Sequence, residues 1–163
     1  MKLSLISIFA CVAVAFVAGS LDLAAQEEAL VPTHANVSYG EHKLNAIDFW
    51  KAEGEGPRPL HIYIHGGGWT GGDKKRSPKQ VQPYLDKGIS FAAVNYRLSG
   101  DHPLPVPVHD AAYAIQFIKS KAKEWNIDKN KIVLTGGSAG ACTSMWILLH
   151  DDLADPKIGR AHV

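Results

Sequence analysis

The residues with the clearest chemical potential lie in the segment Gly136-Gly137-Ser138-Ala139-Gly140. This segment follows an apolar run typical of a strand and precedes an apolar run typical of a helix. The pattern G-x-S-x-G in that setting forms a sharp turn that lifts a serine hydroxyl clear of a sheet. Flanking glycines are needed because a Cβ would clash in so tight a turn. The motif alone leaves a purely structural glycine-rich turn open as the alternative.

A second glycine cluster, His65-Gly66-Gly67-Gly68-Trp69, directly follows the β-branched run at 60–64. Such a run is far rarer by chance than G-x-S-x-G. Successive glycines let the backbone approach a substrate and turn N–H groups toward an oxyanion. A phosphate-binding loop is the alternative use. It is disfavoured because G-x-x-x-x-G-K-[ST] is absent, and Lys74 and Lys75 do not open a helix in the required way.

The elements that must position these two motifs can be read from hydrophobic patterning. We expect strands at 36–39, 46–51, 60–64, 89–96 and 131–135. We expect helices at 78–88, 111–125 and 138–150, with Ser77 as the N-cap of the first. Pro103, Pro105 and Pro107 predict an extended linker before the second helix. Early strands followed by alternating β and α units predict an α/β fold with a mostly parallel sheet flanked by helices.

Together the motifs resemble those of the hormone-sensitive-lipase-like esterases. The sequence is more similar still to the secreted esterases grouped with the bifunctional feruloyl and acetyl-xylan esterases. The likeness spans about residues 37–156 and is carried by His65 to Trp69, Gly71-Gly72-Asp73-Lys74, Val94-Asn95-Tyr96-Arg97-Leu98 and Gly136 to Gly140. Many members have a second glycine where this chain has Ala141.

This resemblance implies the α/β-hydrolase fold and a serine hydrolase of carboxylic esters. It implies Ser138 as the nucleophile, with the amides of Gly67, Gly68 and Ala139 as the oxyanion hole. Acetyl or feruloyl esters on polysaccharide are the substrates that it suggests, with no metal or organic cofactor. A peptidase or amidase on the same fold remains an alternative, because the motifs do not fix the leaving group. A non-catalytic binding protein of hydrolase fold is a further alternative.

A catalytic acid and a histidine are expected after Ser138, in that chain order. His150 does not fit, since a helix from Ser138 would place it roughly 18 Å away. We therefore expect residues 26–157 to be the N-terminal part of a hydrolase domain whose C-terminal strands, acid and histidine are missing. Residues 158–163 match the translation of a sequencing adapter, so we expect a non-native tail there.

The N-terminus has the layout of a signal peptide at 1–25. Lys2 precedes an uncharged apolar run at 3–18, and small residues follow at 24–25. This predicts a secreted or periplasmic protein that is free of the membrane after cleavage. Cleavage near Ser20 and an uncleaved anchor are alternatives. The net charge of +1 and the lack of a basic stripe exclude nucleic acid as a partner.

Several other residues admit two interpretations. Trp69 could form a wall of a substrate cleft or cover the core. Asp73 could position the glycine loop or be a solvated turn residue, which we favour. His109 and Asp110 resemble an acid–base pair, but they precede the serine, and Asp110 is more simply a residue at a helix N-terminus. Cys142 is expected to be a single buried thiol.

Overall fold

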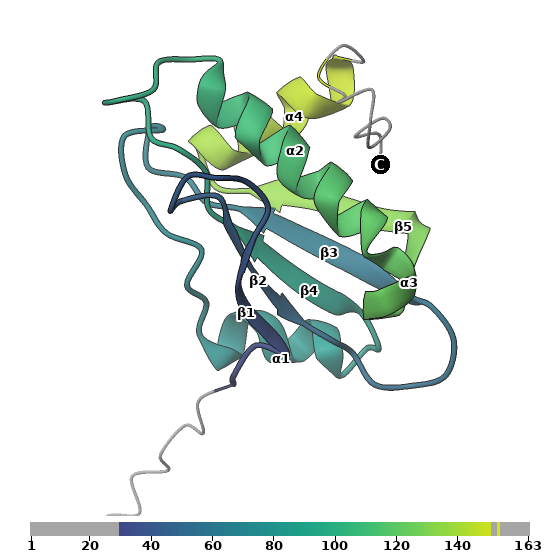
Figure 1. Cartoon of the computed structure of the whole chain (residues 1–163). Coiled ribbons are helices and arrows are strands. Elements are labelled where there is room, and N and C mark those ends of the chain that lie inside the picture. Colours follow the sequence, from purple (N-terminus) through teal and green to yellow (C-terminus); the bar gives the residue numbers. More distant parts are fainter. Residues whose placement is uncertain (1–29, 151–152, 154–163) are drawn as a thin grey trace, which may run out of the picture.

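The computed structural model of the chain describes residues 30–150 and residue 153 (Figure 1). Within these residues it contains five strands and four helices. Their order is β1 (His34–Ser38), β2 (Ala46–Trp50), β3 (Arg58–Ile64), α1 (Pro78–Leu85), β4 (Ser90–Val94), α2 (Val106–Ser120), α3 (Ala122–Trp125), β5 (Ile127–Gly136) and α4 (Ala139–Leu149).

The strands form one sheet in the order β1-β2-β4-β3-β5. β4, β3 and β5 pair in parallel, whereas β2 is antiparallel to both β1 and β4. All strands except β2 therefore run in the same direction, and the predicted α/β fold class is confirmed. In the register, Ile64 pairs with Val94 on one side and with Gly136 on the other. The carboxyl ends of these three strands consequently lie at one edge of the sheet.

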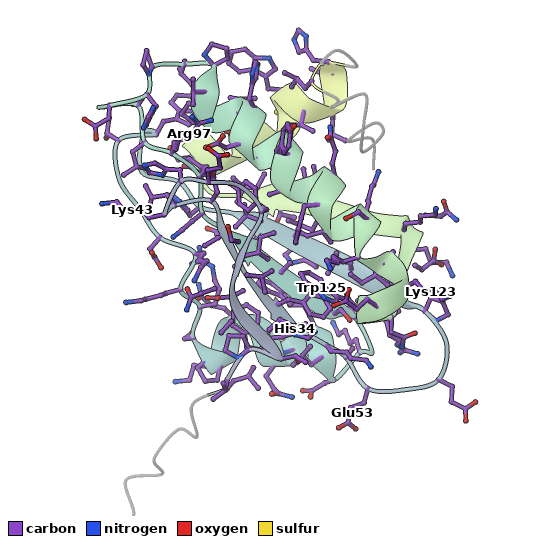
Figure 2. The ribbon with its side chains drawn as sticks, viewed as in Figure 1. His34, Lys43, Glu53, Arg97, Lys123 and Trp125 are labelled. Carbon is purple, nitrogen blue, oxygen red and sulfur yellow. The ribbon has the colours of Figure 1, made fainter. Side chains whose placement is uncertain are left out.

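Helices cover both faces of the sheet (Figure 1). On one face, Ile62 and Ile64 of β3 pack with α2, α3 and Ile147 of α4 in the main core. On the other face, a smaller cluster joins α1 to Phe91 of β4, with Tyr63 against it. This arrangement follows from strand geometry, because successive side chains point to opposite faces. His34 of β1 closes one end by stacking on Trp125 of α3, with ring centroids 5.2 Å apart (Figure 2).

Three predicted segments have boundaries that differ clearly from the structure. α2 begins at Val106, so Pro107 lies in its first turn and not in an extended linker. Proline suits that position because its missing N–H would have no helical partner there. The helix predicted at 111–125 is divided into α2 and α3. The strand predicted at 131–135 is longer in the structure, where it runs from Ile127 to Gly136 as β5.

Cys142 is exposed, which contradicts the expected buried thiol. It shares an exposed face of α4 with Met145 and Leu149, at the spacing that places side chains on one side of a helix. Val133 on β5 is exposed as well. Large apolar side chains therefore face solvent along β5 and α4, at the side of the sheet where β5 has no neighbouring strand among the described residues.

No helix in the described part of the chain is long and apolar enough to cross a membrane. The predicted signal peptide at 1–25 and the predicted tail at 158–163 lie outside the described residues.

Candidate active site

Both glycine motifs leave the sheet at the same edge and lie against each other. The glycine loop (residues 65–72) follows Ile64 of β3, and the serine turn (residues 136–140) starts at Gly136 of β5. A Cβ added to Gly66 would lie 2.5 Å from the carbonyl oxygen of Gly137 and 3.4 Å from the Ser138 Cβ. The absence of a side chain at Gly66 thus permits direct packing of the two segments.

The serine turn is tight and strained. Ser138 has φ 50° and ψ −117°, a conformation sparsely populated for residues with a Cβ. A Cβ on Gly136 would overlap the backbone of Gly140, and one on Gly140 would overlap the Ile64 carbonyl oxygen. The Gly140 N–H donates to the Gly137 carbonyl at 2.9 Å. These close backbone contacts restrict the shape of the turn.

Ser138 is exposed and is the N-cap of α4. The first N–H groups of a helix lack intrahelical partners and carry the positive end of the helix dipole. The N–H of Ala139 is the first of these. Negative charge that developed on an atom bound beside Ser138 would therefore be stabilised.

The glycine loop has the left-handed backbone that glycine tolerates. φ is 104° at Gly67 and 60° at Gly68, and both residues are exposed. The Gly67 carbonyl accepts the N–H of Thr70 at 3.0 Å and of Gly71 at 3.1 Å. Glycine-rich turns of this kind can present N–H groups to an anion.

Tyr96 holds the start of the glycine loop through its hydroxyl and its ring. Its hydroxyl donates to the His65 carbonyl at 2.8 Å, and its ring stacks on the His65 ring at 4.2 Å between centroids. Tyr96 is only 1% exposed, and burial raises its pKa to about 12, so the phenol stays protonated and can donate. Burial lowers the pKa of His65, whose ring donates from Nδ1 to the Gly66 carbonyl. Sequence reasoning missed Tyr96 as a support of the loop.

Asn95 holds the segment directly after the glycine loop. Its Oδ1 accepts the Lys74 N–H at 2.6 Å, and its Nδ2 donates to the Asp73 carboxylate at 3.1 Å. The buried Lys74 ammonium in turn donates to Asp48 at 2.7 Å and to Asn36 at 2.8 Å. Asp73 is therefore an exposed turn residue, as favoured above, that also bonds to the loop's support.

His109 and Asp110 do not form a pair. His109 is exposed, whereas Asp110 is buried and accepts Arg97 Nη2 at 2.6 Å and Nε at 2.8 Å (Arg97 is labelled in Figure 2). Asn45 donates to the same carboxylate at 2.9 Å. The view of Asp110 as simply a helix N-terminal residue was incomplete, because it anchors the segment that carries Tyr96.

His150 follows the last residue of α4, and its ring lies 6.1 Å from that of Trp146. The full length of α4 separates it from Ser138, as the sequence predicted. Among the described residues there is no group of three or more His, Cys, Asp or Glu side chains that could hold a metal ion.

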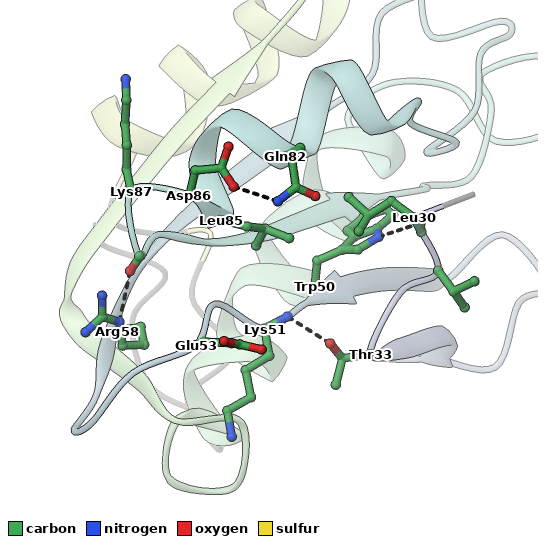
Figure 3. Close-up of a pocket in the computed structure, with 12 residues that line it drawn as sticks. Leu30, Thr33, Trp50, Lys51, Glu53, Arg58, Gln82, Leu85, Asp86 and Lys87 are labelled. Carbon is green, nitrogen blue, oxygen red and sulfur yellow. Dashed lines mark hydrogen bonds between the residues drawn. The ribbon is translucent and has the colours of Figure 1, made fainter. Parts of the chain in front are cut away.

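Figure 3 shows a pocket of about 850 Å³. It lies at the opposite end of the sheet from the serine. Its lining includes Trp50 at the end of β2, Arg58 at the start of β3 and Leu85 at the end of α1. Because β3 runs from Arg58 toward Ile64, this pocket is separated from the glycine loop by the length of the strand.

A parallel-stranded core flanked by helices, with a glycine loop and a serine turn meeting at one edge, defines an α/β hydrolase. Residues 47–155 match the BD-FAE family, a family of esterases with this fold. The chain belongs to the BD-FAE family, which confirms the resemblance found in the sequence.

Relatives and solved structures agree with this assignment. The chain is 33% identical over 127 residues to a probable carboxylic ester hydrolase, LipM, of Mycobacterium tuberculosis, covering 75% of this chain and 29% of the relative. It is 32% identical over 126 residues to a kynurenine formamidase of Debaryomyces hansenii, covering 73% of this chain and 41% of the relative.

Among solved structures, an esterase of Thermogutta terrifontis with bound propionate matches with a TM-score of 0.67 and 25% identity, over 78% of this chain and 50% of that one. A truncated carbohydrate esterase from gut microbiota shares the fold, with a TM-score of 0.68 and 24% identity, over 79% of this chain and 47% of that one. The chain thus spans about a third of the length of the curated relatives and about half of the length of the solved structures that it matches.

Proposed function

We propose that the complete protein is a serine hydrolase of carboxylic esters, with Ser138 as its nucleophile. The amides of Gly67, Gly68 and Ala139 form its oxyanion hole. The observation that carries this proposal is the packing of the glycine loop against the serine turn, where Gly66 meets the Gly137 carbonyl. The strained, exposed backbone of Ser138 next to this contact supports the proposal as well. Membership of an esterase family supports the same function.

In the proposed reaction, Ser138 Oγ attacks the ester carbonyl carbon and its proton passes to a histidine base. The carbonyl π electrons move onto oxygen, where the N–H groups stabilise the charge. The tetrahedral intermediate collapses, and the alcohol leaves with the proton from the histidine. Water then attacks the acyl-enzyme by the same route, which releases the acid and restores the serine.

The histidine and its acidic partner belong after Ser138 in this fold. We assign them to a C-terminal part of the domain that pairs with β5 and covers α4. The exposed apolar side chains of Val133, Met145 and Leu149 support this assignment, because an unpaired edge and an open apolar face are what such a part would bury.

The proposed substrates are acyl esters such as acetyl or feruloyl groups on polysaccharide. The resemblance to feruloyl and acetyl-xylan esterases supports this choice. A polymeric substrate outside the cell requires export, which the signal-like segment at 1–25 would provide. No metal or organic cofactor enters this chemistry.

An amidase is the second candidate, favoured by the formamidase among the relatives. The same tetrahedral intermediate serves both reactions, so the described residues do not select the leaving group. An acetyl ester and an acetyl amide that carry the same aryl group separate the candidates. We expect the ester to be hydrolysed, and preferential hydrolysis of the amide would reverse the assignment.

The direct test is Ser138→Ala in the full-length protein, assayed with p-nitrophenyl acetate. We expect kcat to fall on the order of 10⁶-fold, because the nucleophile and its base act as a unit. Cys142→Ala is the matched control, since this exposed thiol lies one helical turn along α4 and should be dispensable. Activity retained in Ser138→Ala would reject the nucleophile. A full-length wild type without activity on esters or amides would favour the binding-protein alternative.

A further inference from the structure

We propose that Trp69 and Thr143 are a positioning pair that holds the two halves of the oxyanion hole at a fixed separation. This inference rests on the proposed function and deepens it. Trp69 follows Gly68 at the end of the glycine run, and Thr143 lies one turn into α4, beyond Ser138 and Ala139. The indole Nε1–H of Trp69 donates to the Thr143 hydroxyl at 3.0 Å.

The Thr143 hydroxyl relays this contact into the first turn of α4. It donates to the Ala139 carbonyl at 2.9 Å while it accepts from Trp69. A hydroxyl carries one donor and two lone pairs, so it can make both bonds together. Thr143 is fully buried, at 0% exposure, where water does not compete for the hydroxyl. The glycine loop is thereby tied to the turn that carries the Ala139 amide.

The backbone conformation of Trp69 indicates that surrounding contacts hold this residue in place. Its φ is 60°, in the left-handed region that residues with a Cβ avoid. The Trp69 carbonyl accepts the Ser99 N–H at 2.7 Å, and the side chain reaches across to Thr143. An unfavourable conformation persists only where surrounding contacts over-determine it. Trp69 is thus held from both its backbone and its side chain.

The consequence for catalysis is geometric. Gly67 and Gly68 come from one segment and Ala139 from another, and oxyanion donors act only when their separation fits one oxygen atom. A misplacement of about 1 Å can cost on the order of 10²-fold in rate. Loss of the Trp69–Thr143 bond should therefore lower kcat. KM should stay nearly unchanged, because the substrate's contacts elsewhere in the site are kept. Trp69 packs against the main core, as one of its two interpretations predicted, and the positioning role adds to that packing.

Ser144 provides a matched control within the same helix. Its hydroxyl is also buried and donates to the carbonyl four residues back, Gly140, at 2.9 Å. Within residues 30–150 that hydroxyl makes no hydrogen bond to the glycine loop. Thr143→Val and Ser144→Ala each remove such a helical bond, but only Thr143→Val removes the link to Trp69. A purely structural role of the helix hydroxyls would make the two variants behave alike.

The test compares Thr143→Val, Thr143→Ser, Trp69→Phe, the double variant and Ser144→Ala in the full-length protein. Measurements are kcat and KM on p-nitrophenyl acetate, the thermal transition and the inhibition constant of an aryl trifluoromethyl ketone. We expect Thr143→Val and Trp69→Phe each to lower kcat on the order of tenfold. The ketone, whose adduct carries an oxyanion, should bind more weakly by a similar factor. The double variant should lose little more than either single one, because the same Trp69–Thr143 bond is absent in all three.

Thr143→Ser keeps the hydroxyl and should restore kcat, and Ser144→Ala should stay near wild type. Unchanged kcat in both Thr143→Val and Trp69→Phe would overturn the pair, and so would an equal loss in Ser144→Ala. If Thr143→Val shows no cooperative thermal transition and is therefore unfolded, the kcat of Trp69→Phe decides the test, because that variant alters only a half-buried side chain. An inactive Ser138→Ala beside unchanged pair variants rejects the pair alone, whereas an active Ser138→Ala rejects the proposed function with it.

Discussion

The serine turn and the glycine loop meet at one edge of the sheet, yet they are held by different means. In the serine turn, close backbone contacts at Gly136 and Gly140 fix the shape. In the glycine loop, backbone hydrogen bonds to the Gly67 carbonyl are joined by side chains from distant parts of the chain. The hydroxyl of Tyr96 binds the start of the loop, and the amide of Asn95 binds the segment directly after it.

This difference shows why one segment is a compact sequence motif and the other is not. A turn whose close backbone contacts require glycine carries its sequence signal in its own glycines, within five residues. A loop fixed by side chains depends on partners such as Tyr96, which is 30 residues or more from the carbonyls it binds. Perturbing each kind of support separately should therefore give effects of different size.

The largest effect within the glycine loop is expected for Gly67→Ala. Gly67 has φ 104°, and its added Cβ would overlap the Gly71 carbonyl oxygen. The loop would have to move and misalign an oxyanion donor, which costs roughly 10²–10³-fold in kcat. Gly71→Ala is the control, because a Cβ there meets nothing within 4 Å. Equal kcat values for the two variants in folded full-length protein would mean that the loop conformation is irrelevant to turnover.

A smaller effect is expected for Tyr96→Phe, which removes the hydroxyl bond to His65 and keeps the ring stack. One buried hydrogen bond contributes about 1 kcal/mol, so we expect a fall in kcat of about fivefold and a slightly lower thermal transition. Tyr84→Phe, on the other face of the sheet, serves as the control. A comparable loss of kcat in Tyr84→Phe would argue against a specific role for the Tyr96 hydroxyl.

The smallest effect on activity is expected from Asp110→Asn, which acts through stability and its pH dependence. Burial alone would raise the pKa of Asp110, but hydrogen bonds from Arg97 and Asn45 outweigh it and lower the pKa below its ordinary value. A depressed folded-state pKa stabilises the protein above the unfolded-state pKa, and this stability is lost as pH falls through the folded-state value.

At neutral pH, Asp110→Asn should therefore reduce the free energy of unfolding by about 1–3 kcal/mol. Its stability should also depend less on pH below about 4, where the unfolded carboxyl titrates. Urea titrations of the full-length protein between neutral and acidic pH measure both quantities. A variant that keeps the wild-type acid dependence would show that the Arg97–Asp110 pair does not contribute to it.

The fold class and the two motifs could be predicted from the sequence because each is a local signal. Alternating strand and helix patterns gave the α/β fold, and short glycine segments identified Ser138 and the loop that meets it. The supports could not be predicted in this way. Asp110 resembled a helix N-terminal residue, because nothing local shows that Arg97 and Asn45 converge on it. Cys142 was assigned to the interior because the apolar run at α4 does not reveal which face meets the sheet.

The central claim, that Ser138 is the nucleophile, is tested most directly by covalent trapping. The full-length protein is treated with a fluorophosphonate, digested and mapped by mass spectrometry. Phosphorus in this reagent is attacked by an activated serine, which expels fluoride and leaves a stable adduct. We predict a single adduct on Ser138 that forms in step with the loss of ester hydrolysis and is slowed by excess substrate. Complete inactivation with the adduct on another residue, or continued hydrolysis by protein fully labelled at Ser138, would contradict the account.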